Sequence, residues 1–420
     1  MKGKNLALLI IVAAGLAAWA AWSSKTSRRS APDLIGKRVL PNLPINDVRT
    51  IQVTTPQEKL TITKSNDTWI VKNTYGYPAD LPKVKGALIK LSEMKIGQVM
   101  RVSQKQKEAL KMVPPDAGVT NTAGTLVELF AANDKKAASL LVGDVRQRKS
   151  PARDGFEAYG GYPDGQYVSP DGGKNVFLVK DLFEDLSPRI QDWLDLELLS
   201  IEPSELSAIT IASADGKELK LSRTDAAGTL ELEGLAGDEE LDSSKSYDMQ
   251  SALSYLRATD IADPALTEAA LGLDKAAVYR AVTTKGQIVT VRIGGSPTNG
   301  TDRYVRFDVA MKPADTNAPA VQSTDTNAVT AARKVADERK KTEEKTSALS
   351  AKLGGWTYLL DNRKLLSMTL SRETLVKKKE PPKTTDSANP EDGEAGPVPE
   401  KPVGDGVTTT PVSGNDHPAP

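Results

Sequence analysis

The sequence predicts an α+β fold made of two tandem repeated modules, each a mainly antiparallel β-meander covered by helices. Three observations predict it. Apolar and polar residues alternate in short runs, and turn-forming residues separate these runs. The same order of runs, followed by a helical pattern, then returns roughly 160 residues further along the chain. The modules are predicted to span residues 45–200 and 201–376.

The first module opens with three predicted strands. They cover residues 48–53, 58–63 and 68–72. Ile51 and Val53 fall on one face of the first strand, and Leu60 and Ile62 fall on one face of the second. Trp69 in the third strand is expected to belong to the same core, because a strand Trp is usually a packing residue.

A helix is predicted over residues 81–94. Asp80 is a suitable N-cap and Pro82 stands in the first turn. Val84, Leu88 and Leu91 recur at helical spacing. This helix is therefore expected to cover the apolar face of the meander.

The rest of the first module is predicted to be mainly strands, with two further helices. The helices are predicted at residues 103–112 and 181–199, the second kinked at Pro188. Strands are predicted at residues 97–102, 125–131, 138–142, 166–169 and 175–180, with a long loop over 145–165.

The second module repeats the apolar positions of the first. Ile209 and Ile211 correspond to Ile51 and Val53, Leu219 and Leu221 to Leu60 and Ile62, and Leu230 to Trp69. The predicted strands are 205–211, 217–222, 229–232, 278–283, 288–293 and 304–309, and the predicted helices are 244–256, 267–271 and 363–375. An insert at residues 311–353 corresponds to only a brief turn, residues 170–174, in the first module, and its part 328–353 is rich in helix-forming residues.

Composition excludes several kinds of chemistry. The chain has no cysteine, so disulfides, thiolate metal sites, a Cys nucleophile and a lipid attached to Cys are excluded. The single histidine, His417, stands close to the end of the chain. Lys+Arg and Asp+Glu are 55 each, which gives no basic field for a nucleic-acid partner. We therefore expect neither an enzyme nor a cofactor.

The two ends of the chain differ in character from the modules. The apolar run from Leu6 to Trp22 predicts a transmembrane anchor at residues 1–24, and a cleaved signal peptide is the alternative. Residues 25–44 are expected to form a stalk. Basic residues flank the apolar run on both sides almost equally, and we place the body of the protein outside the cytoplasm. The Pro-rich residues 377–420 are predicted to be a disordered tail.

Carboxylates offer one candidate for catalysis. Six of them lie on the predicted helix 181–199: Asp181, Glu184, Asp185, Asp192, Asp195 and Glu197. Acid and base catalysis needs two carboxyls held across a cleft, whereas acidic residues at this density are typical of a solvated helix face. No catalytic residue is predicted.

The loop that holds Tyr159 and Tyr162 offers a second candidate, because its aromatic rings suit a sugar or a peptide. A long surface loop is the plainer interpretation. The glycine pairs after Asp171 and at Gly294 precede no helix, so they do not fit a phosphate loop. Asp164 and Asp171 lack the oxygen ligands of a calcium loop, and all of these segments are predicted to be turns.

These features resemble the bacterial domain-of-unknown-function family 4340. The resemblance rests on Ile51-x-Val53, Leu60-x-Ile62 and Thr68-Trp69-x-Val71, on the helix after Asp80, and on Leu271-Gly-Leu-Asp274 before a strand. It covers roughly residues 45–310 in two copies. It implies a membrane-anchored extracytoplasmic protein with an accessory role, associated in some members with ABC-transporter or gliding-motility components. No catalytic residue carries over.

We therefore expect a single-pass protein of the bacterial inner membrane that acts as a scaffold by protein–protein contact. Its expected partners are the lipid bilayer, through Leu6 to Trp22, and a protein of the cell envelope. An envelope glycan- or peptide-binding module is the alternative, and a carboxylate-dependent hydrolase is a third hypothesis.

Overall fold

The computed structural model describes residues 34–115, 121–148, 161–223, 228–298, 300–313 and 326–379. The predicted anchor at residues 1–24, residues 25–33 of the predicted stalk and almost all of the predicted tail lie outside this range. Among the helices that are described, none is long and apolar enough to cross a membrane.

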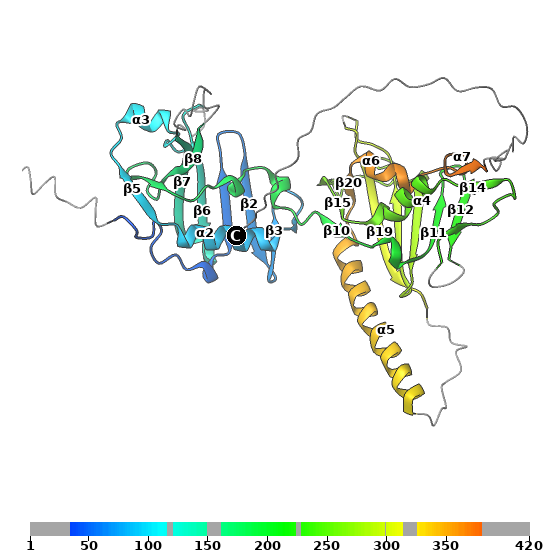
Figure 1. The fold of residues 1–420 in the computed structure, drawn as a ribbon. Coiled ribbons are helices and arrows are strands. Elements are labelled where there is room, and N and C mark those ends of the chain that lie inside the picture. Colours follow the sequence, from blue (N-terminus) through cyan, green and yellow to red (C-terminus); the bar gives the residue numbers. More distant parts are fainter. Residues whose placement is uncertain are drawn as a thin grey trace, which may run out of the picture. The chain divides into compact units, whose positions relative to one another are not determined.

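The fold is α+β with mostly antiparallel sheets, as predicted. The first sheet has nine strands in the order β4-β3-β2-β1-β6-β7-β8-β9-β5 (Figure 1). Its strands are β1 Thr50–Thr54, β2 Lys59–Ser65, β3 Thr68–Val71, β4 Tyr77–Pro78, β5 Ile96–Met100, β6 Thr125–Phe130, β7 Lys136–Arg148, β8 Tyr162–Ser169 and β9 Val176–Val179.

The second sheet has eight strands in the order β13-β12-β11-β17-β18-β19-β20-β16. Its strands are β11 Leu206–Ala212, β12 Glu218–Ser222, β13 Glu231–Leu232, β16 Asp260–Ile261, β17 Ala277–Thr283, β18 Gln287–Ile293, β19 Arg303–Met311 and β20 Tyr358–Leu360. The two sheets have the same strand order if the strands of each are numbered along the chain and β4, which alone has no counterpart, is left out.

The register of the strands follows the predicted apolar positions. In the first sheet Ile51 lies opposite Ile62 and Val53 opposite Leu60. In the second, the matching pairs are Ile209 with Leu221 and Ile211 with Leu219. All eight side chains are buried, as are Trp69 and Leu230, so the prediction of one apolar face on each meander is confirmed.

Helix α2, Leu81–Glu93, begins as predicted. The Asp80 carboxylate accepts a hydrogen bond from the Lys83 backbone N–H at 2.9 Å, and Pro82 lies in the first turn. Val84, Leu88 and Leu91 are buried in the core that also holds the apolar residues of the strands. Helix α3, Gln104–Ala109, starts at Ser103 with a capping box.

The helices of the second half are shorter than predicted, except for α5, Thr326–Leu353. Helix α4 covers Ser243–Gln250, after which a 3₁₀ turn and strand β15, Leu256–Arg257, replace the rest of the predicted helix. The predicted helix 363–375 is broken into α6, Asn362–Leu365, and α7, Arg372–Leu375. Turns stand in place of the predicted helix 267–271, followed by the 3₁₀ turn Leu273–Lys275.

The predicted helix 181–199 is wrong. Two 3₁₀ turns, Glu184–Leu186 and Ile190–Trp193, lie in extended chain that ends in strand β10, Glu197–Leu199. Tertiary contacts outweigh helix propensity here. Trp193 is fully buried, and its backbone C=O accepts a hydrogen bond from the Asp80 N–H at 2.8 Å.

Two other boundaries differ from the prediction. Strand β7 extends to Arg148 and β8 starts at Tyr162, so the predicted loop 145–165 is shorter at both ends. Strand β21, Val376–Lys378, pairs with β14, Glu239–Leu241, and so continues two residues into the predicted tail. At the other end, Val39 and Leu40 of the predicted stalk are instead buried in the hydrophobic core.

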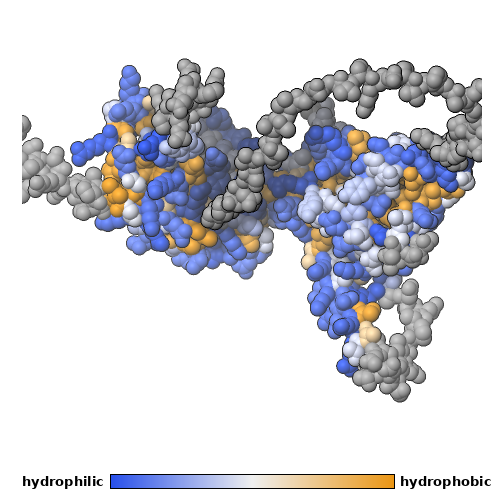
Figure 2. Space-filling view, in the orientation of Figure 1, coloured by the Kyte–Doolittle hydropathy of each residue, from blue (hydrophilic) through white to orange (hydrophobic). Residues whose placement is uncertain are grey.

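Helix α5 is the helical part of the predicted insert. Near its C-terminal end Thr346 and Leu353 are buried, and the Thr346 hydroxyl accepts a hydrogen bond from the Gln287 side chain at 3.1 Å. Residues 333–338 are exposed on every side. The face of this helix seen in Figure 2 is mainly hydrophilic.

Candidate binding groove at the edge of the second sheet

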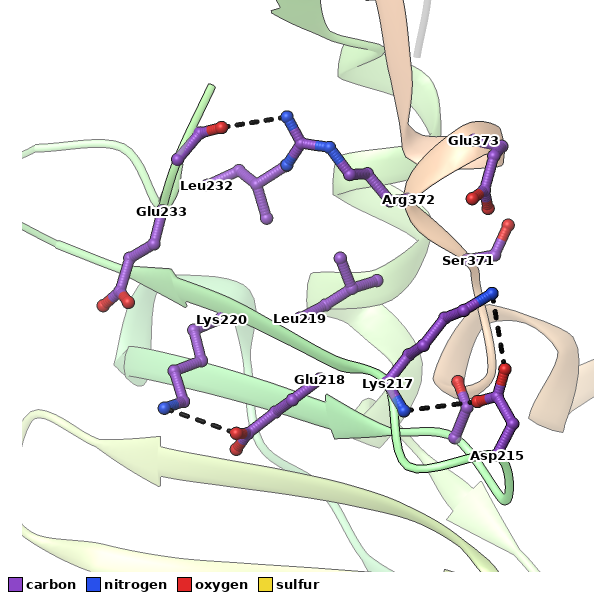
Figure 3. Close-up of a pocket in the computed structure, with 12 residues that line it drawn as sticks. Asp215, Lys217, Glu218, Leu219, Lys220, Leu232, Glu233, Ser371, Arg372 and Glu373 are labelled. Atoms are coloured by element: carbon purple, nitrogen blue, oxygen red, sulfur yellow. Dashed lines mark hydrogen bonds and ion pairs between the residues drawn. The ribbon is translucent and has the colours of Figure 1, made fainter. Parts of the chain in front are cut away.

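A groove of about 620 Å³ lies at the β12–β13 edge of the second sheet (Figure 3). Three segments line it: the β11–β12 hairpin together with the start of β12, the chain from Leu232 to Gly234, and residues 371–373 at the start of α7. We call it the edge groove. It exists because β13 is only two residues long and pairs with the last two residues of β12, which leaves the first half of β12 without a full neighbour.

The floor of the edge groove is apolar. Leu219 and Leu232 lie on the core face of their strands and are 9% and 5% exposed. Figure 3 shows both side chains in the middle of the groove, with charged side chains around them. Such a floor suits an apolar side chain of a ligand.

Charged residues of both signs form the rim. Lys217 Nζ lies 3.4 Å from the Asp215 carboxylate, and Lys220 Nζ lies 3.4 Å from the Glu218 carboxylate. Arg372 donates a hydrogen bond to the Gly234 backbone C=O at 2.9 Å and also pairs with Glu239. Each basic side chain of the rim is therefore paired with a carboxylate, and the net charge of the lining is close to zero.

Two carboxylates of the rim are held in their ionised form. The backbone N–H of Lys217 lowers the pKa of Asp215, and a hydrogen bond from the Ser371 hydroxyl lowers the pKa of Glu373. A general acid at neutral pH needs the opposite shift. The arrangement suits binding through hydrogen bonds and apolar contact rather than proton transfer.

The backbone of β12 presents hydrogen-bonding groups to the edge groove. Ser213 N–H donates to Lys217 C=O and Arg223 N–H donates to Ser207 C=O, both across to β11. Because bonding sides alternate along an antiparallel strand, the backbone groups of Glu218 and Lys220 point the other way, toward the groove.

Comparison with known proteins gives one match. Residues 158–276 match the family model described as "Domain of unknown function (DUF4340)". The match supports the resemblance seen in the sequence. It runs from β8 of the first sheet to the 3₁₀ turn after β16, and so includes β12, β13 and Gly234 of the edge groove. No curated protein and no solved structure matches the chain.

The DUF4340 match also covers the six carboxylates that the sequence places on one helix. They do not share a helix face, and four of them pair with separate basic residues. The pairs are Asp185 with Lys90 at 2.8 Å, Asp192 with Arg189 at 3.8 Å, Asp195 with Lys352 at 2.9 Å and Glu197 with Arg257 at 3.8 Å. Asp181 and Glu184 lie in the same extended segment, so the solvated helix face expected from the sequence does not exist.

The other predicted candidates lie apart from the edge groove. Tyr162 starts β8 with an exposed side chain, and Tyr159 lies outside the described residues. Asp171 forms the expected turn, where its carboxylate accepts from Asn175 N–H at 2.8 Å. Asp164 lies within β8 rather than in a turn, and it pairs with Arg146.

Gly294 lies where β18 connects to β19 and donates to the Tyr304 C=O at 2.8 Å. Within the described ranges, no group of three or more Asp, Glu or His residues is placed to hold a metal ion.

The edge groove was not predicted from the sequence. Its signal lies in the comparison of the two predicted modules, in which apolar positions agree and polar positions differ.

Proposed function

We propose that this protein is a non-catalytic, membrane-anchored accessory or scaffold protein that acts by protein–protein contact on the extracytoplasmic side of a bacterial inner membrane. Its body would consist of two tandem copies of one α+β module. The shared strand order of the two sheets, from which only β4 departs, supports the duplication. The apolar run from Leu6 to Trp22 supports the anchor.

The edge groove is the observation that carries the binding role. It combines an apolar floor with outward-facing backbone groups, while the pKa of Asp215 and that of Glu373 are lowered. The acidic residues 181–197 favour the same conclusion, because most of them are neutralised by separate partners rather than gathered in a cleft. A component of an ABC-transporter or gliding-motility complex is the proposed class of partner.

Affinity purification tests this proposal. The tagged full-length chain is isolated from detergent-solubilised native membranes and its companions are quantified by mass spectrometry. We expect one envelope protein at near-stoichiometric amount, and we expect a variant lacking residues 1–24 to leave the membrane fraction. Purification without any stoichiometric companion would contradict the scaffold role.

The side of the membrane is tested separately. A reporter that is active only outside the cytoplasm, fused after Pro420, is expected to be active. Activity of a cytoplasm-only reporter at the same position would reverse the proposed orientation.

A further inference from the structure

The first sheet closes its own edge with a side-chain amide. Asn73 follows β3, and its Oδ1 accepts a hydrogen bond from the backbone N–H of Thr61 at 2.8 Å. Its Nδ2 donates to the backbone C=O of Lys59 at 2.8 Å. The carboxamide therefore satisfies two outward-facing groups of β2 where the neighbouring strand has already ended.

The register identifies the corresponding position in the second sheet. Ile62 lies opposite Val71 in the first sheet, and Leu221 lies opposite Leu232 in the second. One residue further on, Lys72 N–H donates to Thr61 C=O, and Glu233 N–H donates to Lys220 C=O, both at 2.9 Å. The residue that corresponds to Asn73 is therefore Gly234.

Gly234 has no side chain with which to close the edge. The two backbone groups that correspond to those bound by Asn73 are the N–H of Lys220 and the C=O of Glu218. In the part of the chain that the structure describes, neither group makes a hydrogen bond. The C=O of Gly234 is held instead by Arg372, at the other side of the groove.

This donor and acceptor stand two residues apart on one side of a strand. In a parallel pairing with β12, one residue of an extended chain can donate its N–H to the Glu218 C=O and accept the Lys220 N–H with its own C=O. Its apolar side chain would be placed next to Leu219 and Leu232. Because each basic side chain of the rim is already paired and the net charge of the lining is close to zero, a strongly charged ligand gains little from it.

We propose that the edge groove binds an extended, uncharged polypeptide segment of the partner by strand addition to β12, with the two hydrogen bonds that Asn73 supplies internally in the first sheet. This inference rests on the proposed scaffold function and names the site and the chemistry of its ligand. Main-chain hydrogen bonds give affinity in this mode of recognition, and a pocket for an alternate side chain gives selectivity.

The variant Gly234→Asn tests the site by placing a side chain with a carboxamide in the edge groove, beside the open groups of β12. A Cβ at Gly234 meets no atom within 4 Å, and its φ of +74° is one that Asn tolerates better than most residues. Gly355→Asn is the matched control, because Gly355 has a φ of +81° and equally open surroundings but lies outside the groove.

The probe is a displayed library of random 12-residue peptides, selected on the full-length chain in detergent. We expect enrichment of peptides with apolar residues at alternate positions. Their affinity should fall about tenfold or more in Gly234→Asn and stay unchanged in Gly355→Asn, since two hydrogen bonds are lost. N-methylation of a central backbone amide of the peptide should have a similar effect.

Hydrogen exchange on the wild-type chain gives a measurement that does not depend on the variant. A selected peptide should slow the exchange of the Lys220 amide at least tenfold. Equal binding by Gly234→Asn, equal binding of the N-methylated peptides, or unchanged exchange at Lys220 would each overturn the groove proposal.

Failure of this inference is distinguishable from failure of the scaffold function. A stoichiometric membrane partner whose capture is unaffected by Gly234→Asn overturns the groove and leaves the scaffold intact. If peptides bind in the groove but the protein purifies without any companion, the groove proposal stands and the scaffold function is overturned.

Discussion

The two sheets share a strand order but differ in what covers them and in how their edges end. A continuous helix of 13 residues, α2, packs on the first sheet, whereas the second has the eight-residue α4, the four-residue α6 and α7, and the C-terminal part of α5. The edge of the first sheet is completed by β4 and Asn73, and the corresponding edge of the second is open at Gly234. Apolar positions are thus held in common while polar positions and coverings diverge.

This difference indicates that buried positions determine the strand pairing, whereas exposed positions are free to differ between the two sheets. Burial of matched residues such as Ile51 and Ile209 determines which strands pair, because a shift of one residue would expose the whole apolar face. The exposed positions carry no such constraint. One sheet can therefore serve as a closed structural copy while the other presents a groove.

The largest expected effect comes from the matched core positions Trp69 and Leu230. Trp69→Ala should lower the free energy of unfolding by about 3–5 kcal/mol and Leu230→Ala by about 2–5 kcal/mol, because both remove a buried side chain. Urea denaturation followed by circular dichroism measures both. A loss below about 1 kcal/mol for one of them would break the equivalence of the two cores.

A smaller effect is expected for Asn73→Ala. Removal of the carboxamide leaves Thr61 N–H and Lys59 C=O without their bonds, at a cost of about 1–2 kcal/mol in unfolding free energy. Amide exchange at Thr61 should become faster at the same time. Lys72→Ala, at the exposed neighbouring position, is the control and should change neither quantity. Unchanged exchange at Thr61 would remove the contrast between the two edges.

The smallest effect is expected at the helix caps. The carboxylate of Asp80 accepts from Lys83 N–H at 2.9 Å, and that of Asp242 accepts from Lys245 N–H at 3.0 Å. Asp80→Ala and Asp242→Ala should each cost about 1 kcal/mol. The same urea measurements apply, and the Asn variants, which keep a capping oxygen, should recover most of each loss. If only one of the two Ala variants lowers the free energy of unfolding, the two capped helices are not equivalent.

Much of the fold follows from local sequence patterns. The alternation at Ile51, Val53, Leu60 and Ile62 predicts both the strands and their buried face, and Asp80 with Pro82 predicts where α2 begins. These signals are local, and the structure agrees with them. The repetition of the apolar pattern also agrees with the shared strand order.

Other parts could not be predicted because contacts distant in sequence determine them. The segment 181–199 has a helical pattern, yet Trp193 is held by a hydrogen bond to Asp80, and β10 pairs with β15. The edge groove was equally hidden. In the sequence Gly234 resembles an ordinary turn residue. Only the strand register shows that it corresponds to Asn73 of the first sheet.

The pairing of β21 with β14 has a consequence for synthesis on the ribosome. Every strand of the first sheet has been translated once Val179 is made, so that sheet can form while the rest of the chain is still growing. The second sheet needs β20, at Tyr358–Leu360, and the two-stranded sheet of β14 and β21 needs Lys378. A nascent chain that stalls within α5 would therefore leave exposed the edge of β19 that β20 covers, and quality-control proteases would meet a folded first sheet joined to an incomplete second one.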